Sequence, residues 1–256
     1  MILDPSTWLL LALAALGAGA LNAIAGGGSF LTFPALVFSG VPPIAANATS
    51  AVAVSPGYLG STLGFRSELA ALPRPLLLQE GLICALGGVA GALLLLVTPA
   101  KVFSAVVPWL LLFATAVFAL GPHLLAALRR RGNAAPGGAR PGWPRPLGLF
   151  VVAVYGGYFN GGLGILLMAL YTLVGEARIH TANALKNLNS LLLSVLSVVA
   201  FAWAGAVHWP QALWMAAWAT AGGFVGARLA RRLPAAAVRA IVIVTGLVMV
   251  TLFFLR

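Results

Sequence analysis

Two clusters of glycine and asparagine are the residues of this sequence best suited to chemistry. One consists of Asn22, Gly26, Gly27, Gly28 and Ser29, and the other of Asn160, Gly161, Gly162 and Gly164. Glycine disfavours a regular helix, and helices restarting near Ser29 and Leu163 would present free N–H groups and positive dipole ends to an anion. Glycine also lets membrane helices pack closely. We favour an anion site because the glycines occur as a pair of clusters and each cluster includes an asparagine.

A second set of polar residues lies near the start of the element that follows each cluster. Its members are Asn47, Thr49 and Ser50 in the first half and Asn183, Lys186 and Asn187 in the second. Neutral amides and hydroxyls can donate hydrogen bonds to an oxyanion, although asparagine is also a common helix cap. Ser55, Ser194 and Ser197 are expected to be structural, because serine within a helix usually bonds to its own backbone.

Two charged residues lie within apolar stretches. Lys186 can neutralise an anionic substrate, since a charge inside a membrane is costly and is retained mainly for function. It can equally extend to the membrane interface, because it lies about one turn from its helix end. Glu80 is the matching acid. Pairing with Lys186, a role in carrying a coupling proton and simple interfacial placement all stay open for it.

The elements that must position these residues are membrane helices. The chain of 256 residues is 61% hydrophobic and 7% charged, whereas soluble domains are about a quarter charged. Most of its long charge-free stretches reach the length of about 20 residues that spans a bilayer. The net charge of +11 comes from basic residues between apolar segments, which set membrane orientation. We therefore expect no nucleic-acid partner, and lipid as the surroundings.

The chain is an internal duplication. Besides the glycine clusters, Ala46-Asn47-Ala48 recurs as Ala182-Asn183-Ala184, and Gly87, Gly88 and Gly91 recur as Gly222, Gly223 and Gly226, in the same order. The latter glycines have the spacing of helix packing. We predict a first membrane repeat over residues 1–121, a flexible Arg/Pro/Gly linker over 122–146 and a second repeat over 147–256.

Each repeat is predicted to contain a glycine-interrupted segment and then three helices. The interrupted segments cover residues 7–40 and 147–175, and the helices cover 45–64, 76–97, 100–121, 181–205, 209–227 and 234–255. An interrupted segment can cross the membrane once or return as a hairpin. Single crossings would divide the basic residues almost evenly, whereas hairpins leave only Lys101 and Arg256 outside. The excess of basic residues in cytoplasmic loops favours hairpins.

The predicted fold class is therefore an all-α polytopic membrane protein with two inverted repeats, each a helical hairpin plus three transmembrane helices. Both termini would lie outside the plasma (inner) membrane and the linker in the cytoplasm. Many secondary transporters share this arrangement. The prediction is a transporter that binds a small anion at the midplane between the hairpin tips.

Three passages resemble the TauE/SafE family of sulfite exporters: residues 22–34, 46–50 and 182–187. The resemblance covers nearly the whole chain except the linker, and implies transport of sulfite, sulfonates or related organosulfur anions. It carries the motif positions over to Gly26, Gly27, Gly28, Pro34, Asn47, Thr49 and Ser50. The second half departs from this pattern, since Leu163 interrupts its glycines and no proline corresponds to Pro34.

Three other functions compete with the transporter. One is a non-transporting membrane scaffold, which would be indicated if no ligand changed the stability of the detergent-solubilised protein. A passive anion channel would use the same donors, and downhill flux under every ion gradient would indicate it. A membrane-embedded enzyme is disfavoured because the chain has only four acids and no helical histidine pair at metal-ligand spacing. We expect no cofactor and no metal, while assembly with further copies of the chain stays open.

Overall fold

The computed structural model describes residues 4–25, 27–133, 145–176, 178–229 and 235–255. Its regular elements within these ranges are all helices. The first half contains α1 (Pro5–Ala25), α2 (Ser29–Phe38), α3 (Pro43–Gly64), α4 (Arg66–Ala70), α5 (Arg74–Val97) and α6 (Ala100–Asn133). The second half contains α7 (Arg145–Tyr158), α8 (Leu163–Leu173), α9 (Ile179–Trp203), α10 (Trp209–Leu229) and α11 (Ala235–Phe254).

The chain is an all-α polytopic membrane protein. Four of its described helices are long and apolar enough to cross a membrane, over Pro5–Asn22, Arg74–Val97, Ala100–Gly121 and His180–Trp203. Large apolar side chains such as Leu78, Val97 and Trp203 remain exposed on the helix bundle. An exposed apolar surface of this extent is unfavourable in water, so it indicates surroundings of lipid.

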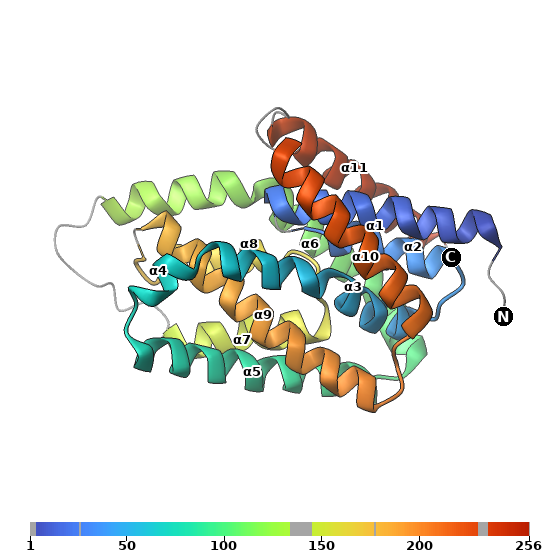
Figure 1. Cartoon of the computed structure of the whole chain (residues 1–256), viewed down its shortest axis with the longest axis horizontal. Coiled ribbons are helices and arrows are strands. Elements are labelled where there is room, and N and C mark those ends of the chain that lie inside the picture. The colour runs from blue at the N-terminus through green and yellow to red at the C-terminus, as the bar shows by residue number, and fades with distance from the viewer. Residues whose placement is uncertain (1–3, 26, 134–144, 177, 230–234, 256) are drawn as a thin grey trace.

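Both interrupted segments form hairpins. Leu31 of α2 lies against Gly17 of α1, and in the second half Leu170 of α8 lies against Gly148 of α7. The short helix thus returns alongside the helix before it. α1 begins and α11 ends at one end of the bundle, whereas α6 ends and α7 begins near the other (Figure 1).

The helix contacts follow the duplication. α1 packs along α10, and their counterparts α7 and α5 pack together in the same way; these are the two most extensive helix pairs. The pair α3 and α10 likewise corresponds to α9 and α5, while α3–α9 and α6–α11 join equivalent helices. Each hairpin therefore packs mainly against helices of the opposite repeat. The relative orientation of the two repeats in a membrane stays a prediction.

Glycines make these helix contacts close. A Cβ atom on Gly91 would meet the carbonyl oxygen of Val154, and one on Gly222 would meet that of Leu16. Gly157 lies equally close to the backbone of Gly88. The role in helix packing that the sequence predicts for the repeated glycines is confirmed for Gly88, Gly91 and Gly222.

One boundary differs from the sequence prediction. Residues 122–133, expected to be flexible linker, continue α6 as helix to Asn133. Alanine, leucine and arginine dominate this stretch, and all three favour helix strongly enough to outweigh a single Pro122. Residues 134–144 of the predicted linker lie outside the described residues.

Candidate functional site

The tips of the two hairpins meet inside the bundle. α2 and α8 begin at Ser29 and Leu163, as the sequence predicts. Gly28 precedes α2, and Gly162 precedes α8 with a φ of 76°, a left-handed conformation that side chains disfavour. The hydroxyl of Ser29 donates to the carbonyl oxygen of Asn160 at 3.4 Å. Residues 131 positions apart therefore form one centre.

Hydrogen bonds from α3 and from α7 of the same hairpin hold the second tip. The hydroxyl of Tyr58 donates to Asn160 Oδ1 at 3.1 Å. The amide of Asn47 donates to the carbonyl oxygen of Tyr158 at 3.2 Å. The hydroxyl of Tyr155 donates to the carbonyl oxygen of Gly161 at 2.6 Å. The equivalent asparagine of the first hairpin, Asn22, makes no hydrogen bond within the described part of the chain. Asn22 is thus the tip amide that remains available to a ligand.

The other predicted site residues divide into two groups. Thr49 accepts a hydrogen bond from the backbone N–H of His208 at 3.0 Å, and Ser50 is bonded to Thr32 at 2.6 Å. These hydroxyls join helices, so a binding role for them stays a prediction. Gly27, Gly28, Gly161, Gly162 and Gly164 are buried near the tips, whereas Gly26 lies outside the described residues.

On α9, Lys186 and Asn183 are half-buried and Asn187 is buried. Lys186 makes no ion pair in the described ranges. Both interpretations of Lys186, as a residue of the binding site and as a residue at the membrane interface, therefore stay predictions. The expected bond to the serine's own helix backbone is confirmed for Ser55, whereas the bonds described for Ser194 and Ser197 go to other helices. Ser55 bonds to the carbonyl oxygen of Ala51 and to Ser194.

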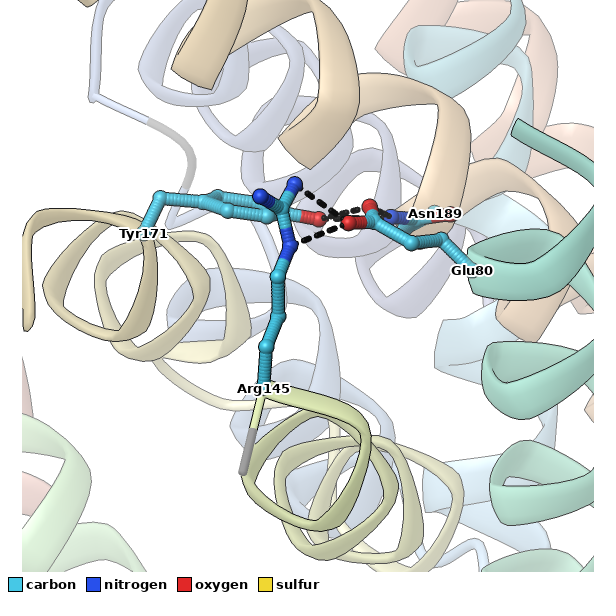
Figure 2. Close-up of polar contacts among 4 residues, drawn as sticks. All are labelled: Glu80, Arg145, Tyr171 and Asn189. Carbon is cyan, nitrogen blue, oxygen red and sulfur yellow. Dashed lines mark hydrogen bonds and ion pairs between the residues drawn. The ribbon is translucent and has the colours of Figure 1, made fainter. Parts of the chain in front are cut away.

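Glu80 forms a buried polar network that joins four helices (Figure 2). Its carboxylate pairs with Arg145 at the start of α7, whose Nε donates at 2.6 Å. The hydroxyl of Tyr171 on α8 and the amide of Asn189 on α9 each donate to the carboxylate at 2.9 Å. The guanidinium also lies over the Tyr171 ring, 5.4 Å from its centroid. The network attaches the second hairpin to α5 and α9.

This geometry corrects one sequence interpretation of Glu80. Its ion-pair partner is Arg145 rather than Lys186, and its side chain is 4% exposed within the bundle. Interfacial placement in the membrane stays a prediction. Arg145 falls within the predicted linker, and no local feature of the sequence indicates that it contacts Glu80. Proton coupling by Glu80 stays a prediction.

No carboxylate lies at the hairpin tips. Of the four acids in the chain, Asp4 is exposed near the beginning of α1 and Glu68 lies on the short α4. Glu176 pairs with Arg178 at 3.2 Å, and Glu80 is neutralised by Arg145. The tips therefore combine backbone and amide donors with no acid to hold a cation.

The sequence is similar to known membrane proteins along nearly its whole length. The model of one family, described as Sulfite exporter TauE/SafE, matches residues 11–253. A probable membrane transporter protein of Sinorhizobium is 28% identical over 237 residues, which cover 91% of this chain and 87% of that protein. The probable membrane transporter protein YfcA of Escherichia coli is 30% identical over 227 residues, covering 84% and 76%. No solved structure matches this chain.

Proposed function

Because this chain belongs to the TauE/SafE sulfite exporter family and is a multi-pass membrane transporter, we propose that it carries a small anion, bound where its two hairpin tips meet. The observation that carries this proposal is the contact between Ser29, the first residue of α2, and Asn160 of the second tip. The start of a helix carries a positive dipole end, which favours negative charge. Some of the first N–H groups of α2 and α8 bond to nearby carbonyl oxygens, as that of Leu163 does to Asn160, so the dipole is the main contribution of the two helix starts.

The charge distribution supports an anion over a cation. A cation site inside a membrane requires carboxylates or several converging carbonyl groups, and all four acids of the chain lie away from the tips or are paired. Lys186, if it faces the pathway, would add positive charge. Neutral donors then come from Asn22 and from the backbone around Gly27 and Gly162.

Sulfite or an organosulfonate is the substrate we propose, on the description of the family. Sulfur oxyanions present several acceptor oxygens around one centre, which suits a site built from N–H donors on two sides. A transporter of this kind would expose the site alternately to the two faces of the membrane, with the repeats inverted, the linker cytoplasmic and both termini outside. Glu80 is the candidate for coupling transport to protons.

Uptake into proteoliposomes tests the proposal. Gly162 and Gly175 both have a positive φ, of 76° and 86°, but only Gly162 lies at a tip. Gly162→Leu should abolish movement of sulfite and small sulfonates, whereas Gly175→Leu carries similar backbone strain and should retain it. Equal activity of the two variants would refute the tip site. Cation flux without anion movement would refute the anion proposal.

Thermal unfolding of the detergent-solubilised protein tests substrate choice. A ligand that binds only the folded state stabilises it by about 2.7 kcal/mol at a concentration of about 100 times its Kd. We expect sulfite or a sulfonate to raise the unfolding temperature more than chloride, phosphate or a carboxylate at equal ionic strength. A response to chloride or phosphate alone would leave the anion site standing and exclude the sulfur substrates.

A further inference from the structure

A cavity of about 420 Å³ lies among α1, α3 and α10, next to the first hairpin tip. Small residues such as Gly57 and Gly60 make room for the cavity. Its lining also includes the polar side chains of Asn22, Ser61 and Thr220, and Phe224. All of these come from the later halves of their helices. α3 continues from here towards α4, which lies at the end of the bundle where α6 ends (Figure 1).

The amide of Asn22 belongs to this cavity and depends on it. A Cβ atom on Gly57 would lie 2.6 Å from Asn22 Nδ2, so any other residue at position 57 would displace the amide. Asn22 makes no hydrogen bond in the described part of the chain. A half-buried amide without a partner, beside a cavity in a membrane protein, is poised to bind a polar solute.

The duplication predicts a second cavity in the other repeat, but larger side chains occupy that place. Alignment of α3 with α9 through Ala46 and Ala182 puts Leu193 at the position of Gly57 and Leu196 at that of Gly60. Leu193 is 1% exposed and lies against Gly88 and Gly156. The two glycines correspond to Gly223 and Ala18, which line the cavity of the first repeat. Leu193 therefore fills the space that its counterpart leaves open.

The polar groups differ between the repeats in the same way. Ser197, the counterpart of Ser61, donates to the carbonyl oxygen of Gly88 at 3.0 Å. Asn160, the counterpart of Asn22, is already bonded to Tyr58, whereas Ser194 at the position of Tyr58 is bonded to Ser55 instead. One asparagine is thus satisfied by protein and the other faces a cavity.

We propose that this cavity is the route by which the anion reaches the hairpin tips from the end of the bundle where α6 ends, and that Leu193 closes the equivalent route in the second repeat. The inference rests on the proposed transport function and adds the path to its site. Asn22 is the amide donor of this path, and it lies beside Gly57, one turn further in than the hydroxyl of Ser61. Gly57 and Gly60 set the width of the path, because neither contributes a side chain.

Gly60→Leu is the variant that tests the path. A Cβ atom at Gly60 meets nothing within 4 Å, and the same holds for Gly64, one turn further along α3. A leucine therefore fits at either position without a clash, but only Gly60 lines the cavity. We expect Gly60→Leu to lower the initial rate of anion uptake by about tenfold or more, because a filled space excludes the solute. Gly64→Leu should leave the rate unchanged, and equal rates in the two variants would overturn the proposal.

Cysteine labelling tests the same path without transport. The native Cys84 is buried and is replaced by alanine, after which Ser61→Cys and Ser197→Cys are treated in vesicles with a membrane-impermeant thiol reagent. The exposed Ser67 on α4, also changed to cysteine, identifies the face. Ser61→Cys should react from the face of Ser67→Cys, and about tenfold more slowly when Gly60→Leu is added, since thiol reactivity follows access. Ser197→Cys should not react.

The two experiments separate the path from the function. Labelling of Ser61→Cys from the opposite face, or at a rate that Gly60→Leu leaves unchanged, would overturn the path even if the wild-type protein transports anions. A wild-type protein that moves no anion would overturn the proposed function, and with it the identity of the solute. The labelling would still decide whether the cavity opens to that face.

Discussion

Removal of either charge of the ion pair between Glu80 and Arg145 should destabilise the protein, and removal of the Arg145 charge should cost more. The carboxylate of Glu80 is 4% exposed, whereas the side chain of Arg145 is 29% exposed. Arg145→Met leaves a buried carboxylate that retains Tyr171 and Asn189 as donors. Loss of one partner from a buried pair costs about 3–5 kcal/mol. We expect about 3 kcal/mol, because the two remaining donors and partial access to water offset some of that cost.

Glu80→Gln should cost less. The guanidinium of Arg145 can then turn towards water, and the amide oxygen of glutamine still accepts hydrogen bonds from Tyr171 and Asn189. Bonds to a charged group contribute about 1.5–3 kcal/mol and neutral bonds about 1 kcal/mol, so the expected loss is about 1–2 kcal/mol. The double variant has no buried charge to leave unpaired. Its loss should therefore fall about 2 kcal/mol short of the sum of the single losses.

The unfolding free energy of the four proteins can be measured by denaturant titration in mixed micelles. We expect a larger loss of unfolding free energy for Arg145→Met than for Glu80→Gln, and a double variant whose loss is smaller than the sum of the two. Additive losses would refute the ion pair as a contributor to stability. A larger loss for Glu80→Gln would refute the burial argument. If only transport, and not stability, responded to Glu80→Gln, the carboxylate would be acting in coupling.

Variants at three further positions test the tips, α9 and the helix packing. Tyr58→Phe leaves Asn160 Oδ1 without its side-chain donor and should lower the unfolding free energy by about 1–3 kcal/mol; an unchanged value would mean that water or the backbone replaces the hydroxyl. Lys186→Met should weaken anion binding by about 1.5–3 kcal/mol in a calorimetric titration, as for a charge-assisted hydrogen bond, with Lys186→Arg only partly tolerated. Unchanged affinity in the methionine variant would assign Lys186 to the interface. Gly91→Ala places a Cβ atom against the carbonyl oxygen of Val154 and should cost about 1–3 kcal/mol, as overpacking does; wild-type stability would refute close packing of α5 on α7.

Local pattern in the sequence is enough for several features of this protein. Composition and charge-free length make it a membrane protein, and the recurrence of Ala46-Asn47-Ala48 reveals two related halves. The starts of α2 and α8 at Ser29 and Leu163 follow from adjacent glycines, which act on the backbone within a few residues. The packing role of Gly91 follows from four-residue spacing, which places small residues on one helix face.

Tertiary structure decides what repeats and spacing leave undetermined. Glu80 and Arg145 are 65 residues apart, and no local sequence pattern around either residue predicts that they form an ion pair. Asn22 and Asn160 hold equivalent places in the duplication, yet one is bonded to Tyr58 and the other faces a cavity. That difference depends on the residues at equivalent positions of α3 and α9. Gly57 leaves the space open, whereas the side chain of Leu193 fills it. Local pattern selects helices and their faces, whereas pairing across the bundle is set by the joint packing of all helices.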